Sequence, residues 1–198
     1  MRVLAIDTAL NACSVALADG EAVLAILSEP MQRGHAERLA PMVEEAMAQA
    51  GAAFESIDRL VVTTGPGSFT GVRVGLAFAR AMALALSKPC VGVSTLEALA
   101  LEQGEAGLRG AMIAAPAGAY FALYQNGSPL IAPALLAQAA LEAALASHPR
   151  MQMAEGAVPD IVALARRGAT LDPARYPPKP LYLRAPDAKP AAPRMVPA

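Results

Sequence analysis

Gly65-Pro66-Gly67-Ser68-Phe69-Thr70-Gly71-Val72-Arg73-Val74-Gly75 is the stretch that decides the fold of this chain. It follows a strand-like apolar run, Leu60 to Thr64, and leads into an almost wholly apolar helix predicted over Thr70 to Leu86. Glycines let a backbone turn tightly and approach another group closely. A loop that enters a helix N-terminus can hold an anion, because unpaired N–H groups point out of the helix there. Two interpretations stay open at this point, a phosphate-binding loop and a loop that contacts protein.

The segments around this stretch predict a mixed sheet with helices packed on it. Asp19-Gly20 lies between two apolar runs, which is a strong signal for a tight hairpin turn. Apolar side chains at spacings of three and four predict helices on both sides of the glycine stretch. The expected strands are Val3 to Asp7, Cys13 to Ala18, Ala22 to Leu27, Leu60 to Thr64 and Cys90 to Val93, and the expected helices are His35 to Ala50, Thr70 to Leu86 and Ser94 to Gln103. This order of strands and helices is typical of an α/β fold.

The second half of the chain is less regular. A strand pair, a turn, an alanine-rich helix and a short helix are expected in that order. They cover Ala111 to Ala115 with Ala119 to Tyr124, Asn126-Gly127, Pro133 to Ser147, and Pro159 to Arg167. From Asp172 onward prolines recur, and such a tail forms no core element of its own. We expect it to lie extended over the body of the protein and then to fray.

Composition excludes several classes of protein. The 198 residues are 55% hydrophobic but only 4% aromatic, so the core is built from aliphatic side chains. A formal net charge of −1 gives no general attraction for a polyanion, which argues against direct binding of nucleic acid. Cys13 and Cys90 are expected to be buried free thiols. The apolar run after Met1 is too short for a signal peptide, and no helix reaches the ~20 residues that cross a bilayer. We expect a cytoplasmic protein.

Few residues suggest catalysis. Asp7 and Thr8 end the first strand, where they could hold a metal or polarise a phosphate, or form an ordinary Asx-turn. The glycine stretch lacks the lysine of a Walker A loop. His35, at a helix start, is expected to be an ordinary solvated side chain. Neither metal-ligand spacings nor a Gly-x-Ser-x-Gly motif occurs, so the sequence argues against an independent enzyme.

Six segments also carry a family resemblance. They are Leu4 to Ala9, Cys13 to Leu17, His35 to Met42, Gly65 to Arg73, Pro89 to Leu96 and Pro180 to Arg184. Together they resemble the TsaB (YeaZ) family. The resemblance implies an actin-like, Hsp70-like ATPase (ribonuclease H-like) α/β fold, with two lobes of mixed sheets flanked by helices and a shortened second lobe. Its expected parts are residues 1–103 for the N-terminal lobe, 104–171 for the second lobe and 172–198 for the proline-rich tail.

The resemblance implies a function in modifying tRNA. The family member is a non-catalytic scaffold that binds and activates TsaD, which transfers threonylcarbamoyl to the adenosine beside the anticodon of ANN-decoding tRNAs. The resemblance further implies that TsaE joins a larger complex and that the protein contacts tRNA only within that complex. It implies no membrane association, and a homodimer for the isolated protein. TsaD holds a metal with a His-x-x-x-His pair, and Thr95 and Leu99 stand at those positions here. The resemblance therefore implies no metal site and no catalytic residue.

The resemblance also implies the residues of two contacts. The first two helices pack against TsaD or a second copy, and ATP or ADP would be held at the TsaD contact, with no cofactor bound independently. The expected partner contacts are Leu39, Val43, Met47, Arg73, Leu76, Ala79, Arg80 and Ala83. The expected vestigial or shared nucleotide contacts are Asp7, Thr8, Gly65, Gly67, Ser68, Thr70 and Gly71.

Two alternative functions remain. Asp7-Thr8 and the glycine stretch would also suit an independent ATP-dependent phosphotransferase of the same fold. A peptidase ranks last, because the sequence offers no metal pair and no nucleophile triad. The second lobe departs from the family, since Ala114 to Tyr120 stands where an Asp-Ala-Arg stretch followed by Glu and Tyr is common.

Overall fold

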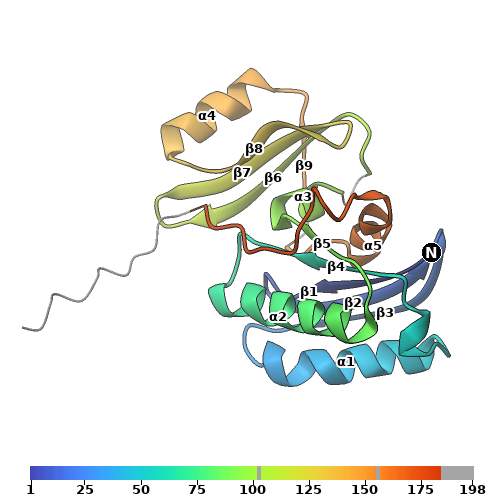
Figure 1. The fold of residues 1–198 in the computed structure, drawn as a ribbon. Coiled ribbons are helices and arrows are strands. Elements are labelled where there is room, and N and C mark those ends of the chain that lie inside the picture. Colours follow the sequence, from blue (N-terminus) through green and yellow to red (C-terminus); the bar gives the residue numbers. More distant parts are fainter. Residues whose placement is uncertain (102–103, 155–156, 184–198) are drawn as a thin grey trace, which may run out of the picture.

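A computed structural model describes residues 1–101, 104–154 and 157–183 of the chain. Two lobes are stacked on each other, each built around its own sheet (Figure 1). The first sheet has five strands in the order β3-β2-β1-β4-β5, and the second has four in the order β8-β7-β6-β9. The predicted two-lobed α/β fold with mixed sheets is confirmed.

The first sheet combines antiparallel and parallel strands. β1 pairs with β2, and β2 with β3, in antiparallel register, whereas β1, β4 and β5 run parallel. The predicted strands and the Asp19-Gly20 turn are confirmed, with Gly20 in the left-handed region at φ 60°. The strands are β1 Arg2–Asp7, β2 Ala12–Asp19, β3 Ala22–Pro30, β4 Arg59–Thr63 and β5 Cys90–Val93.

Helices cover both faces of this sheet, which is why β1 and β2 are buried along almost their whole length. α1 (His35–Gln49) and α2 (Phe69–Leu86) pack side by side on one face, and a short 3-10 helix, η1 (Phe54–Ser56), follows α1. α3 (Thr95–Ala100) follows β5, and its N-terminus is capped by Ser94 as predicted. The C-cap of α3 is Leu101, and residues 102 and 103 of the predicted helix lie outside the described part of the chain.

α2 is long and apolar enough to cross a membrane when judged by length and composition alone. In the structure its buried stripe, which includes Val72, Leu76 and Ala79, packs into the core beneath the first sheet. The opposite face of α2 exposes Arg73 and Arg80. α2 is thus an amphipathic helix that packs on one face of the first sheet.

The second lobe contains two strands, β8 and β9, beyond the pair that the sequence suggested. Its elements are β6 Leu108–Ala115, β7 Gly118–Gln125, β8 Ser128–Leu136, α4 Gln138–Ser147 and β9 Gln152–Met153. The expected helix over Pro133 to Ser147 is therefore wrong in its first third, where β8 pairs antiparallel with β7. β8 is an edge strand, and an edge tolerates Pro129 and Pro133 because one row of its N–H groups has no ladder partner. α4 covers one face of this sheet and α3 the other.

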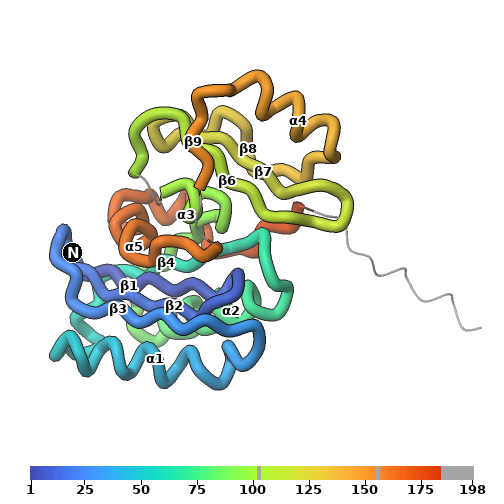
Figure 2. Tube along the Cα trace, turned by 180° about the vertical axis from the view of Figure 1, so that it is seen from behind, coloured from blue at the N-terminus to red at the C-terminus, as the bar shows by residue number. Residues whose placement is uncertain are grey.

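α5 (Ile161–Thr170) returns to the first lobe. Ile161, Leu164 and Ala165 pack against the face of the first sheet opposite α1 and α2 (Figure 2). A Cβ on Gly168 would lie 2.6 Å from the Cβ of Val61, so only glycine lets this helix lie so close to the sheet. The predicted second lobe, residues 104–171, therefore differs from the structure at α5, because its apolar stripe completes the first core.

The segment after α5 first forms a turn, in which Arg175 N and Tyr176 N donate to the carbonyl of Asp172, and then runs extended beside β5. Gly92 N donates to the carbonyl of Tyr176 at 2.9 Å, and Leu181 N donates to the carbonyl of Thr64 at 2.8 Å. The expected extended course is confirmed for residues 177–183. The expected fraying concerns residues outside the described part of the chain.

Candidate functional site

The glycine stretch lies directly against the turn that follows β1. Ser68 N donates to the carbonyl of Ala9 at 2.7 Å. A Cβ added to Gly67 would lie 2.2 Å from that carbonyl oxygen, and one added to Gly71 would lie 2.0 Å from the carbonyl oxygen of Thr8. These glycines are required because two backbone segments of the same chain touch there.

Side chains reinforce this contact. Thr8 Oγ1 donates to the carbonyl of Gly71 at 2.7 Å, and Thr8 is 1% exposed. A Cβ on Gly75 would lie 2.5 Å from Thr8 Oγ1, so each of the first two turns of α2 packs closely against Thr8. Ser68 caps α2 by accepting a hydrogen bond from Gly71 N at 3.2 Å. The group that the glycine stretch approaches is therefore the backbone of Thr8 and Ala9, in the turn after β1.

Asp7 lies beneath this contact, fully buried. Its Oδ1 accepts hydrogen bonds from Ala9 N at 3.1 Å and from Thr63 Oγ1 at 2.5 Å. Its Oδ2 is buried and has no hydrogen-bond partner among the residues that the structure describes. Burial raises the pKa of Asp7, although the hydrogen bonds from Thr63 and Ala9 act in the opposite direction. The Asx-turn interpretation of Asp7 fits this geometry, whereas a carboxylate closed off from solvent offers nothing to an incoming ligand.

Asn substitution of Asp7 should remove a pH dependence of stability. Because the pKa of Asp7 is higher in the folded state than in the unfolded state, the folded protein holds this proton more tightly. The free energy of unfolding therefore falls as the pH rises from about 4 through the folded-state pKa. Asp7→Asn keeps an oxygen for Ala9 and Thr63 but has no charge to bury.

Urea unfolding of both proteins at several pH values between 4 and 8 tests this. The stability of Asp7→Asn relative to the parent should grow steadily with pH. A difference that is constant across the range would show that Asp7 is ionised at no cost in the folded protein.

The other groups considered for chemistry are isolated. His35 is 6% exposed, so the expectation of a solvated histidine is wrong, and within the described part of the chain its Nε2 has no hydrogen-bond partner. Within residues 1–101, 104–154 and 157–183 no three His, Cys, Asp or Glu side chains gather to hold a metal ion. Cys13 is buried and Cys90 is half-buried, and both are free. Burial raises the thiol pKa of Cys13 to about 11 and that of Cys90 to about 12, so neither is a reactive thiolate.

The structure thus brings the residues predicted for nucleotide contact together, but several of them are buried against one another and not open to solvent. Asp7, Thr8, Gly65 and Gly71 are buried, while Gly67, Ser68 and Thr70 lie at the surface. Gly65 adopts φ 95°, precedes Pro66 through a cis peptide bond, and accepts a hydrogen bond from Thr95 N at 2.8 Å. The surface members lie at the N-terminal end of α2.

The residues predicted for partner contact divide into two groups. The apolar ones are all at most 7% exposed and belong to the core of the first lobe: Leu39, Val43, Met47, Leu76, Ala79 and Ala83. This corrects the prediction for these side chains, because the apolar stripes of α1 and α2 face the chain's own sheet. Arg73 and Arg80 are exposed, as a partner contact requires.

The exposed side of α2 carries residues that the sequence reasoning missed. Leu84 is 82% exposed and Phe69 is 63% exposed. The Arg73 guanidinium lies 3.7 Å above the centre of the Phe69 ring, and its Nη2 donates to Tyr182 Oη at 3.2 Å. We call this set the α2 surface: Phe69, Arg73, Arg80, Leu84 and Tyr182. Two signals were available, since Phe69 interrupts the glycine stretch and Tyr182 lies in the one ordered-looking piece of the tail.

Comparison with known proteins identifies close relatives. Residues 25–175 match the protein family described as TsaD, tRNA N6-adenosine threonylcarbamoyltransferase. The chain is 38% identical over 160 residues to the tRNA threonylcarbamoyladenosine biosynthesis protein TsaB of Escherichia coli K12, a match covering 79% of this chain and 68% of that protein. It is 34% identical over 212 residues to an uncharacterized protein of Mycobacterium tuberculosis H37Rv, covering 96% of this chain and 95% of the other.

The fold agrees with a solved structure. YeaZ from Pseudomonas aeruginosa superimposes with a TM-score of 0.70 at 29% sequence identity. The match covers 92% of this chain and 99% of that one. Sequence and structure point to the same set of relatives.

Proposed function

Since the chain belongs to the TsaB (YeaZ) family of tRNA threonylcarbamoyladenosine biosynthesis proteins, we propose that it is a non-catalytic scaffold that binds and activates TsaD. TsaD then transfers threonylcarbamoyl to the adenosine beside the anticodon of ANN-decoding tRNAs. The observation that carries the proposal is the α2 surface, where Leu84 is 82% exposed. Isolated apolar side chains are common on surfaces, but Leu84 and Phe69 lie on one face of one helix with two arginines.

Charge on the neighbouring helix adds to this argument. α1 exposes Glu37 and Glu44, whereas α2 exposes Arg73 and Arg80. The surface formed by the two helices is therefore acidic on one side and basic on the other. A partner built on a similar fold and turned by a half-rotation would place opposite charges against each other, which favours one register of docking.

The closed glycine stretch supports a non-catalytic role. The backbone of Thr8 and Ala9 occupies the position against Gly67 and Gly71 where a phosphate would have to enter. We expect the isolated protein to bind no nucleotide, and ATP or ADP to be held only in the complex with TsaD, near exposed Ser68 and Thr70. A phosphotransferase would need this contact to open.

Size-exclusion chromatography with light scattering tests the proposal directly. Mixed with TsaD of its own organism, the protein should elute at the mass of a one-to-one complex, and depleting it in cells should lower the threonylcarbamoyladenosine content of tRNA. Runs with TsaE and nucleotide, and of the protein alone, would report the larger complex and the homodimer. Separate elution from TsaD together with unchanged tRNA modification would refute the scaffold role.

A further inference from the structure

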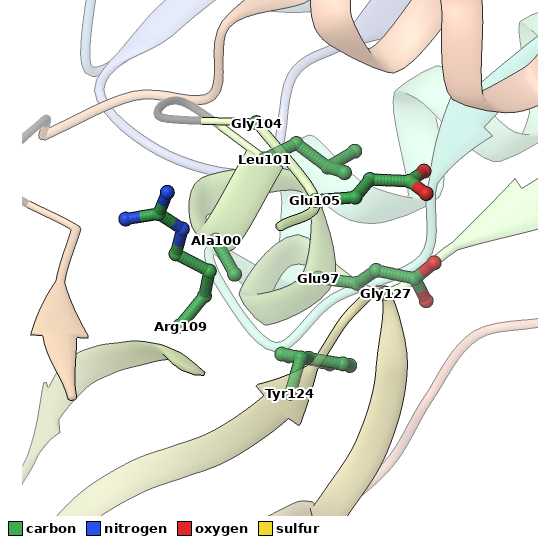
Figure 3. Close-up of a pocket in the computed structure, with 8 residues that line it drawn as sticks. All are labelled: Glu97, Ala100, Leu101, Gly104, Glu105, Arg109, Tyr124 and Gly127. Atoms are coloured by element: carbon green, nitrogen blue, oxygen red, sulfur yellow. The ribbon is translucent and has the colours of Figure 1, made fainter. Parts of the chain in front are cut away.

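The two lobes meet at a group of charged side chains that the proposed function does not use. It lies where α5, α3, the turn between β7 and β8, and residues 104–107 come together. Figure 3 shows the pocket at this junction, with the carboxylates of Glu97 and Glu105 pointing to the same side and Arg109 lying on the other. The same junction includes Arg167 of α5, whose side chain is only 15% exposed.

Arg167 contacts three different parts of the chain. Its Nε donates to Glu97 Oε1 at 2.8 Å, on α3. Its Nη1 donates to Glu105 Oε1 at 3.3 Å, in the segment that leads into the second lobe. Its Nη2 donates to the carbonyl of Gly127 at 3.5 Å, in the turn between β7 and β8. One guanidinium therefore connects a helix of the first lobe to the second sheet.

The contact of Arg167 with Glu97 is shielded from water, whereas Glu105 is 48% exposed at its side chain. Glu97 is 14% exposed at its side chain, and burial raises its pKa while Arg167 holds it down. The hydroxyls of Tyr124 and Ser94 lie 3.3 Å apart beside it, and Tyr124 is 4% exposed. Ion pairs in such surroundings are screened less than surface pairs, and a planar guanidinium can satisfy several acceptors in fixed directions.

The neighbouring residue offers a contrast. Arg166 points outward, and its Nη2 lies 3.3 Å from Glu21 Oε2, whose side chain is 90% exposed. Nη2 also donates to the backbone carbonyl of Glu21 at 3.1 Å, so both of these contacts are to one residue of the first lobe. Of the two adjacent arginines, Arg167 therefore connects the two lobes, whereas the described contacts of Arg166 are only to the first lobe.

We propose that Arg167 is a latch that fixes the angle between the two lobes by bridging Glu97, Glu105 and the Gly127 carbonyl. The arrangement suits a scaffold whose partner surface must keep one shape. Arg167 is a positioning residue, because it acts through the lobes and touches no reacting group. The proposal stands independently of TsaD binding, since it concerns the chain alone.

Distance measurement between spin labels tests the latch in the full-length chain. Labels on cysteines introduced at exposed Ala48 of α1 and exposed Ala146 of α4, with Cys13 and Cys90 replaced by alanine, report the separation of the lobes. The parent should give one narrow distance distribution. Arg167→Met should broaden or shift it, and Arg166→Met should leave it unchanged.

A second variant keeps the test decisive if Arg167→Met fails to fold. If Arg167→Met does not fold, Glu97→Gln, which keeps the shape but removes the charge, should broaden the distribution. Arg167→Lys should fall between parent and Arg167→Met, because a single ammonium cannot reach all three acceptors in fixed directions. A narrow, unshifted distribution in every folded variant of Arg167 and Glu97 would overturn the proposal.

Discussion

Gly71→Ala is expected to destabilise the protein by about 4 kcal/mol, combining overpacking with the loss of a buried hydrogen bond. The added Cβ would lie 2.0 Å from the carbonyl oxygen of Thr8, a separation that no pair of non-bonded atoms tolerates. Neither side can move easily, since Thr8 follows the central strand β1 and Gly71 is itself buried where α2 meets that strand's end. To relieve this steric clash, α2 would have to move away from the sheet, which would break the hydrogen bond from Thr8 Oγ1 to the Gly71 carbonyl.

Urea unfolding followed by circular dichroism measures this effect. Thr70→Ala is the matched control, because Thr70 is the preceding residue of the same helix and is exposed. Its free energy of unfolding should stay within about 0.5 kcal/mol of the parent. A Gly71→Ala variant as stable as the control would mean that the glycine stretch opens away from β1 in solution, which would revive the phosphate-loop interpretation.

The first lobe could be predicted from sequence because its signals are local. Asp19-Gly20 marks a tight turn, Ser94 caps a helix, and the glycine stretch separates a strand from a helix, each within a few residues. The structure agrees with all three. The contact between Gly71 and Thr8 was not predictable in the same way, because 63 residues separate the partners and only the parallel pairing of β1 with β4 brings them together.

The errors have the same physical origin. The alanine-rich stretch from Pro133 to Ser147 has high helix propensity, yet its first residues, 133–136, belong to strand β8, because the edge of β7 was there to pair with. The stripe of α2 was assigned to a partner because its spacing shows only that one face is buried. It does not show what buries that face, and Leu76 and Ala79 proved to face the chain's own sheet. α5 was misplaced for a related reason, since its apolar stripe completes a core formed more than 50 residues earlier in the chain.

Leu84→Glu is expected to weaken binding to TsaD at least 100-fold, which corresponds to about 2.7 kcal/mol. Leu84 is 82% exposed in the isolated chain, so placing it against a partner would remove most of a leucine side chain from water, a gain of about 1.5 to 3 kcal/mol. The variant loses that gain and also has to bury a carboxylate. Because the side chain hardly touches its own lobe, the free energy of unfolding should change by less than about 0.5 kcal/mol.

Calorimetric titration of TsaD with each variant would measure this loss, and Ala146→Glu is its matched control. That residue lies on an exposed position of α4, in the second lobe, and receives the same charge on a helix of similar exposure. If the α2 surface is the contact, only Leu84→Glu weakens binding, whereas an equal loss in both variants would point to a general effect of charge. Unchanged affinity of Leu84→Glu would place TsaD elsewhere on the molecule, and the scaffold role would then have to rest on a surface other than α2.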